Sequence, residues 1–251
     1  MAKPSGKEIL FGFHSVTEAL KAGKRQIETV LISDRRSAGR ADQITALAEE
    51  RGVSVEFCDS KRLDKLTKTP VHQGIAARVS EFPVQNGLDI IPEIQERTSP
   101  CFILVLENIE DPHNLGALIR TALCAGVAYI LIPRNRSAGP SPTVSRTSAG
   151  AMEHAGIYMV TNTASVLRGL KENGVWIFGL DAQGSTSLYE ADLTGSIALI
   201  VGGEHKGVRP GVQKECDFLV SIPISGSVNS LNASVAGGIA MYEARRQRLG
   251  A

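Results

Sequence analysis

The sequence predicts an α/β protein of two units, the larger one built on a parallel sheet. Residues 102–248 alternate short apolar runs with segments of helical spacing, the pattern of a parallel sheet covered by helices on both faces. The run FILVL at 102–106 is continuously apolar, as in a strand that is buried on both sides. Residues 29–79 alternate in the same way over a shorter span, so a small α/β unit is expected before the larger one.

Composition places the unit boundaries at 1–80, 81–100 and 101–251. Residues 81–100 contain three prolines and the dipeptide Asn86-Gly87, which are signals of a linker. Only the stretch Ile90–Ile94 in this linker has the spacing of a helical turn.

The first unit is expected to contain three strands and two helices. Val53, Val55 and Phe57 alternate with polar residues, so they predict a half-buried strand. Asp59 or Ser60 is expected to cap the second helix, which runs through Leu66. The other expected elements are the strands Thr29–Ile32 and Gly74–Val79 and the helix Ala41–Arg51.

The second unit is expected to alternate six strands with five helices. The strands are Phe102–Leu106, Tyr129–Ile132, Ile157–Val160, Val175–Leu180, Ile197–Val201 and Phe218–Ile222. The helices are Asn114–Ala125, Val144–Met152, Ser165–Glu172, Gly211–Glu215 and Asn232–Gln247. Ligands of open parallel sheets bind outside the carboxyl ends of the strands, so the loops there are the expected site.

Composition and charge exclude several classes of protein. The chain has 251 residues, a net charge of +1, 43% hydrophobic residues and no apolar stretch near the roughly 20 residues that span a bilayer. It starts without a secretory signal, and its four cysteines are far apart, which disfavours zinc and disulfides and favours the cytoplasm. Residues 1–80 hold 14 Lys and Arg against 10 Asp and Glu, which indicates either polyanion contact there or solvated surface charge.

The common nucleotide and hydrolase signatures are absent. No G-x-G-x-x-G follows a strand, and no G-x-S-x-G is present. Gly202 and Gly207 have the spacing of a phosphate-binding loop, but Val208 stands where that loop needs lysine. NAD enzymes, NTPases and α/β-hydrolases are therefore disfavoured.

Three loops after strands carry unusual polar groups. In the first, Asn114 can cap a helix and Arg120 follows six residues later, although a capped helix with a surface arginine explains the same residues. In the second, Gly202-Gly203 allows a tight turn, and Glu204 needs a partner such as Arg120. The third loop is dense in hydrogen-bonding side chains, and its Ser230 or Asn232 can cap the last helix. So many polar groups favour a loop that binds a polar ligand.

These loops resemble the three motifs of the SpoU–TrmH family of RNA ribose 2′-O-methyltransferases, in the SPOUT superfamily. The matching stretches are N-x-G-x-x-x-R-T-A from Asn114, G-G-E-x-x-G-V-R from Gly202 and I-P-x-x-G-x-V-x-S-L-N-x-S-V-A from Ile222. The N-terminal unit resembles the family's substrate-binding domain, including the stretches FGFHSV from Phe11 and HQG from His72. The resemblance covers nearly the whole chain.

The resemblance implies a parallel-sheet SPOUT fold with a deep C-terminal trefoil knot, an exception to normal topology. It implies that S-adenosylmethionine contacts Gly202, Ile222 and Leu231, largely through backbone groups. It also implies a homodimer whose active site draws on both chains, so Arg120 need not meet its partners within one subunit.

The resemblance also assigns catalytic roles. Arg120 is expected to activate or orient the ribose hydroxyl, and the orienting role is the simpler one because a guanidinium stays protonated in proteins. Asn114 and Glu204 would position Arg120 or offset its charge. Ser230 and Asn232 would shape the cofactor loop near the ribose. No metal is required, because the sulfonium already makes the methyl group electrophilic.

The two-domain layout is similar to family members that modify a guanosine of large-subunit (23S) ribosomal RNA. A tRNA ribose methyltransferase with the same machinery is the first alternative, and a noncatalytic RNA-binding or ribosome assembly factor is the second. The presence of Arg120, Glu204 and Asn232 argues against the noncatalytic alternative. RNA and a second copy of the chain are the expected partners.

Overall fold

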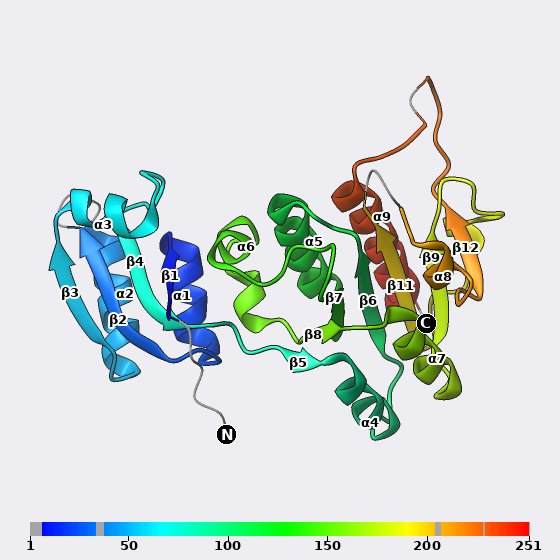
Figure 1. Cartoon of the computed structure of the whole chain (residues 1–251), viewed down its shortest axis with the longest axis horizontal. Coiled ribbons are helices and arrows are strands. Elements are labelled where there is room, and N and C mark those ends of the chain that lie inside the picture. The colour runs from blue at the N-terminus through cyan, green and yellow to red at the C-terminus, as the bar shows by residue number, and fades with distance from the viewer. Residues whose placement is uncertain (1–6, 34–37, 204–206, 228, 251) are drawn as a thin grey trace. The chain divides into compact units, whose positions relative to one another are not determined.

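A computed structural model describes residues 7–33, 38–203, 207–227 and 229–250 (Figure 1). Contacts between Cα atoms divide the chain into an N-terminal unit, Met1–Pro83 with Pro140–His154, and a C-terminal unit, Val84–Gly139 with Ala155–Ala251. This division differs from the expected boundaries 1–80, 81–100 and 101–251. The segment 140–154 packs with the first unit, and most of the expected linker packs with the second.

The N-terminal unit is a four-stranded sheet covered by helices. The strand order is β1–β4–β2–β3, with β4 antiparallel to β1 and β2, and β2 parallel to β3. The strands are β1 Lys7–Phe11, β2 Ile27–Ser33, β3 Ser54–Cys58 and β4 Ile75–Ser80. The helices are α1 Phe13–Ala22, α2 Ala38–Glu50, α3 Ser60–Thr67 and α6 Pro142–Thr147, with a 3-10 turn at Ala151–His154.

Alternate side chains of β2 build a core on each face of this sheet. Val30 and Ile32 pack in the cluster that includes Ile44 of α2. Leu31 points the other way, into the cluster that includes Leu63 of α3. The unit is therefore a sheet between two helical layers, with a fully buried side chain of α3 on one side.

Two features of this unit differ from the sequence expectation. Neither β1 nor α1 was predicted from the sequence, although α1 ends at a glycine, Gly23, in the left-handed conformation. Phe57 is not half-buried as expected but 59% exposed, because it stands near the end of β3, which is an edge strand. The next residue, Cys58, is buried in the α3 cluster. Asp59 does cap α3, accepting a hydrogen bond from the backbone of Arg62.

The C-terminal unit is an eight-stranded parallel sheet, as expected. The strand order is β10–β12–β9–β11–β6–β7–β8–β5, and every neighbouring pair is parallel. The strands are β5 Gln85–Asn86, β6 Phe102–Glu107, β7 Tyr129–Pro133, β8 Ile157–Val160, β9 Trp176–Leu180, β10 Thr186–Ser187, β11 Ile197–Gly202 and β12 Phe218–Ser221. Only the two-residue strands β5 and β10 were not predicted.

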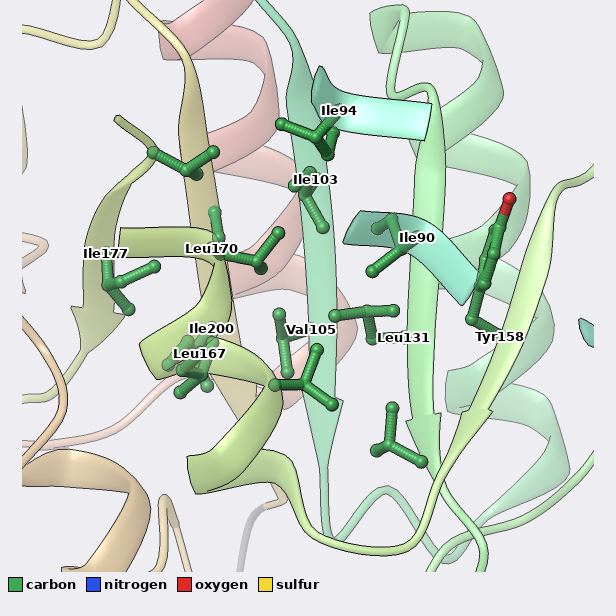
Figure 2. Packing of buried hydrophobic residues seen from close by; sticks show 14 of the residues in the cluster. Ile90, Ile94, Ile103, Val105, Leu131, Tyr158, Leu167, Leu170, Ile177 and Ile200 are labelled. Atoms are coloured by element: carbon green, nitrogen blue, oxygen red, sulfur yellow. The ribbon is translucent and has the colours of Figure 1, made fainter. Parts of the chain in front are cut away.

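Helices cover both faces of this sheet. Those of the C-terminal unit are α4 Ile90–Gln95, α5 Pro112–Ala125, α7 Thr163–Glu172, α8 Pro210–Gln213 and α9 Ala233–Leu249, with 3-10 turns at Gly87–Asp89 and Leu188–Glu190. On one face, Ile90 of α4 and Leu170 of α7 pack with the strand residues Ile103 and Ile177 (Figure 2). On the other, α5 and α9 pack so closely that a Cβ on Gly237 would lie 2.5 Å from a methyl carbon of Leu118.

The start of α5 corrects one expectation. Asp111, not Asn114, caps this helix, and its carboxylate accepts a hydrogen bond from the backbone of His113 at 3.0 Å. The reason is Pro112, whose fixed φ suits the first helical position. Asn114 therefore lies inside the first turn, and its side chain is available for a contact elsewhere.

No helix in the described part of the chain is both long and apolar enough to cross a membrane. Among residues 7–33, 38–203, 207–227 and 229–250, no three His, Cys, Asp or Glu side chains gather as metal ligands, and the four cysteines are free thiols. The threading of the C-terminal segment through a knot stays a prediction, because strand order and register do not test it.

Candidate active site

A hollow lies at the carboxyl ends of β9, β11 and β12, where the sequence predicts ligand-binding loops. Its empty space, including the part that is open to solvent, is about 700 Å³. Most of the lining is apolar side chain or glycine backbone. The lining residues are Leu180, Asp181, Ala182, Val201, Gly202, Gly203, Gly207, Val220, Ile222, Ile224, Ser230, Leu231, Ala233 and Ala236.

Two glycines let the chain double back at the edge of the hollow. A Cβ on Gly202 would lie 2.4 Å from the carbonyl carbon of Gly207, and a Cβ on Gly203 would lie 2.1 Å from the carbonyl oxygen of Asn108. The backbone of Gly207 donates to the carbonyl of Gly203 at 2.8 Å, and the Asn108 side-chain amide donates to the carbonyl of Gly207 at 3.1 Å. Larger residues at 202 or 203 would force this turn, and one wall of the hollow, apart.

A buried ion pair holds the far end of the same turn. The carboxylate of Glu107, at the end of β6, has no solvent exposure. Arg209 donates to it through Nε at 2.7 Å and through Nη2 at 3.0 Å, and Thr163 Oγ1 donates at 2.6 Å. The carboxylate raises the pKa of Arg209, chiefly through this hydrogen bonding. We call this set of three residues the Glu107 clamp.

The Glu107 clamp joins three loops at the carboxyl edge of the sheet. Glu107 ends β6, Thr163 begins α7 and Arg209 precedes α8. The backbone of Gly203 also donates to the carbonyl of Glu107 at 2.8 Å. The segment 203–209 is therefore anchored to the end of β6 at both of its ends.

Asp181 is the one ionisable side chain among the described lining residues. Its carboxylate accepts from the Gln213 side chain at 2.6 Å and from the Gln183 backbone at 2.8 Å. These two bonds fix the carboxylate in place, so the hollow presents a held negative charge. A cation would be favoured there over a neutral ligand of the same shape.

Two of the expected catalytic residues are hydrogen-bonded to each other. Asn232 caps α9, since its Oδ1 accepts from the backbones of Ser234 and Val235 at 2.9 and 3.3 Å. Its Nδ2 donates to Oδ1 of Asn114 at 3.1 Å. The pair joins α5 to α9 next to Leu231 and Ala233, which line the hollow.

The structure does not bring Arg120 to this pair within one chain. Arg120 is exposed on α5, and its guanidinium has no ion pair with any residue of the described ranges. Arg120 follows Asn114 by six positions along the helix, which turns the two side chains about 120° apart. Glu204, its expected partner, lies outside the described residues.

The sequence-predicted residues therefore fall into three groups. Gly202, Ile222, Ser230 and Leu231 line one hollow. Asn114 and Asn232 meet beside it, and Arg120 stands apart. Glu107 and Asp181 were not predicted as site residues, and Arg209 was given no role although it ends the second motif. The available signal for Glu107 was an acid that closes a continuous apolar run.

Two family models match the chain. The SpoU rRNA Methylase family model matches residues 101–242. A model described as RNA 2′-O ribose methyltransferase substrate binding matches residues 9–85. The two matches together span both units, and the first includes every residue that lines the hollow.

Proteins of known name and structure match over almost their whole length. The 23S rRNA (guanosine-2′-O-)-methyltransferase RlmB of Shewanella oneidensis is 40% identical over 242 residues, which is 96% of this chain and 98% of that protein. The enzyme of the same name from Pseudomonas putida is 39% identical over 96% of this chain and 97% of its own. A crystal structure of an AdoMet-bound rRNA methyltransferase from Sinorhizobium meliloti has a TM-score of 0.79 at 26% identity, covering 96% of this chain and 87% of that one.

Proposed function

The chain belongs to the SpoU rRNA methylase family, and from that premise we propose that it methylates a ribose 2′-hydroxyl of 23S ribosomal RNA, at a guanosine. S-adenosylmethionine is the methyl donor in this proposal. The observation that carries it is the hollow, which gathers Gly202, Ile222 and Leu231 from two separate motifs. The names of the full-length relatives support guanosine and 23S rRNA as the target.

The lining of the hollow fits S-adenosylmethionine in its chemistry. Apolar walls and close-packed glycine backbone suit an adenine ring and a bent chain. The fixed carboxylate of Asp181 suits the positive charge of a sulfonium. When bound, the cofactor supplies an electrophilic methyl group. Gly202, Ile222 and Leu231 would hold it, largely through their backbones.

The residues around the hollow then have to orient the ribose. A 2′-hydroxyl must be aligned with the methyl group and must lose its proton during attack. Arg120 binds the neighbouring phosphate and orients the hydroxyl, since a guanidinium that stays protonated is a poor base. Ser230 lines the hollow on the side of the α9 cap, and the Asn114–Asn232 pair fixes that cap. Glu204 offsets the charge of Arg120.

A homodimer completes the proposed site. Arg120 is exposed and about 120° around α5 from Asn114, so a second chain would have to bring an arginine to this hollow. The packed helices α5 and α9 offer a surface for that contact, because Val235 and Tyr242 of α9 are 49% and 51% exposed. Sedimentation should therefore give a dimer, and mixing R120A chains with E204A chains should restore part of the activity.

Methyl transfer tests the proposal. Labelled S-adenosylmethionine is incubated with unmodified 23S rRNA and, separately, with unmodified tRNA, and the products are mapped by their resistance to alkaline cleavage. Label at one guanosine of 23S rRNA is the expected result, and R120A should abolish it while keeping cofactor binding. Label in tRNA alone would show that tRNA, and not 23S rRNA, is the substrate. No label in either RNA would favour a noncatalytic assembly factor.

A further inference from the structure

The N-terminal unit carries an exposed group of basic and aromatic side chains on α3 and at the end of β3. We call Phe57, Lys61, Lys65 and Lys68 the α3 patch. All four residues are exposed. Phe57 and the first turns of α3 line one hollow, whose residues are Phe57, Cys58, Asp59, Lys61, Arg62 and Lys65.

Helical spacing places two of the lysines on the outer face of α3, and the third caps the helix. Lys61 and Lys65 are four residues apart and share one side of α3, and Lys68 is the C-cap residue that follows. Leu63 and Leu66 occupy the opposite side and pack into the core of the unit. Lys61 and Lys65 are thus held on the helix itself, and Lys68 is held at its end.

The acids close to the α3 patch are occupied by other partners. Glu56 forms an ion pair with Arg62. Asp64 accepts from the ring of His72 at 2.9 Å, and Asp59 accepts from the backbone of Arg62 at 2.8 Å. Lys61, Lys65 and Lys68 form no ion pair with any residue the structure describes, which leaves their positive charge available to a ligand.

Phe57 adds a feature that solvated charge does not explain. Its ring is 59% exposed at the open edge of the sheet, although burial of a phenylalanine stabilises a protein. An exposed ring beside lysines suits single-stranded nucleic acid, because bases stack on aromatic rings while phosphates pair with cations. A protein partner would need an acidic surface with an apolar side chain, and nothing in this unit selects for that.

We propose that the α3 patch binds a single-stranded part of the RNA substrate away from the reacting ribose. Phosphates pair with Lys61, Lys65 and Lys68, and an unstacked base lies against Phe57. This inference rests on the proposed function, since it takes RNA to be the substrate. The patch contacts the phosphates and the flat face of a base, which are alike in all nucleotides. It therefore adds affinity for RNA without selecting the nucleotide that is methylated.

Binding and kinetics of the full-length protein test the α3 patch. The variants are K61Q/K65Q, which removes two charges from helix-compatible positions, and Phe57→Thr on the strand. K61R/K65R keeps the charge, and K7Q/K21Q is the matched control, since Lys7 and Lys21 are exposed lysines of the same unit that pair with Glu28 and Glu18. The probes are unmodified transcripts of 23S rRNA and tRNA, bound at several salt concentrations.

K61Q/K65Q should weaken RNA binding by about tenfold and lower the salt slope by about 1.4, from roughly 0.7 per lost phosphate contact on a single strand. Its KM for RNA should rise with kcat and cofactor binding unchanged. Phe57→Thr should weaken binding with the salt slope unchanged, and K61R/K65R and K7Q/K21Q should bind as the wild type does.

Equal binding by K61Q/K65Q, Phe57→Thr and wild type would overturn the α3 patch, even if methyl transfer is found. A loss of binding in K7Q/K21Q as large as in K61Q/K65Q would also overturn it, because net charge would then suffice. If the wild type transfers no methyl group but K61Q/K65Q still loses RNA binding, the proposed function fails and the patch stands.

Discussion

Two arginine–carboxylate pairs in the described part of the chain have a carboxylate that is at most 1% exposed, and they belong to different units. In the N-terminal unit, Arg25 has no side-chain exposure and donates to Glu153 at 2.8 Å and to Glu8 at 2.5 Å. In the C-terminal unit, Arg209 is 38% exposed and bonds to a fully buried Glu107. The Arg25 network ties the segment 140–154 to the sheet, whereas the Glu107 clamp anchors a turn that lines the hollow.

An arginine–carboxylate pair thus stabilises the fold in the N-terminal unit and anchors the proposed site in the C-terminal unit. Glu153 also accepts from Ser145 at 2.7 Å, so every partner of the Arg25 network lies within the N-terminal unit and none lines the hollow. The Glu107 clamp lies one residue from Asn108, which holds Gly207 of the lining. Loss of Arg25 pairing should therefore cost stability without touching the hollow. Loss of Arg209 pairing leaves the buried Glu107 carboxylate without its cation, so it should cost activity as well as stability.

The largest effect is expected on stability from Glu153→Ala. Removal of the carboxylate leaves the Arg25 charge buried with Glu8 as its remaining acid, a change that typically costs about 3–5 kcal/mol. Urea unfolding measures the loss, with the exposed Glu49→Ala as control. A cost no larger than that of Glu49→Ala would contradict the structural role of this network.

A smaller effect, on activity, is expected from Arg209→Met. Without the two hydrogen bonds to Glu107, the 203–209 turn shifts, and misplacement by about 1 Å can cost on the order of 100-fold in kcat/KM. Arg209→Lys should fall between this variant and wild type, because it keeps the charge but loses the bidentate geometry. Arg168→Met, which breaks an exposed pair with Glu215, is the control. Equal activity of Arg209→Met and Arg168→Met would show that the clamp does not position the site.

Asp181→Asn should reduce the preference of the hollow for S-adenosylmethionine over S-adenosylhomocysteine. The variant keeps an acceptor for Gln213 but loses the charge, so affinity for S-adenosylmethionine should fall about tenfold, or ~1.4 kcal/mol. S-adenosylhomocysteine has no sulfonium charge, and its affinity should change little. Calorimetry on both ligands measures the difference, with the exposed Asp192→Asn as control. An equal loss for the two ligands would indicate lost shape rather than lost charge.

The smallest effect is expected at the pair Arg246–Glu243 of α9, whose arginine is 69% exposed. Hydrogen bonds from Arg246 and then Gln247 lower the pKa of Glu243 to about 2 from an ordinary value of 4.5. Its contribution to stability is thus present above pH 4.5 and is lost as the pH falls through about 2. Glu243→Gln should lower the thermal midpoint at pH 7 by no more than about 2 °C. A difference from wild type that persisted at pH 2 would contradict this assignment.

Elements with a strong periodic pattern were predictable from the sequence, and contacts between distant residues were not. All six expected strands of the C-terminal unit are present, because continuous apolar runs such as FILVL identify buried parallel strands. The packing of 140–154 on the N-terminal unit depends on Arg25 and Glu153, which are 128 residues apart and have no local signal. Phe57 was misplaced because alternation shows which side chains share a face but not where an edge strand is left uncovered.

The site was predictable to the extent that its residues belong to motifs. Gly202, Ile222 and Leu231 come from motifs whose family resemblance suggested a shared ligand, and they line one hollow. Glu107 and Arg209 lie 102 residues apart, so their pairing appears only in the folded chain. Asp181 follows the carboxyl end of a predicted strand, where ligands of parallel sheets bind, but it belongs to no motif that distinguishes it from a surface acid.

The most direct test of the proposed cofactor site is hydrogen–deuterium exchange of the wild-type chain with and without S-adenosylmethionine. We expect protection in peptides covering 180–182, 201–209 and 220–236, which contain the residues that line the hollow, and none in 54–68, which contains the α3 patch. Saturable binding with protection confined to other segments, or with 180–182 and 220–236 unchanged, would contradict the claim that this hollow is the cofactor site.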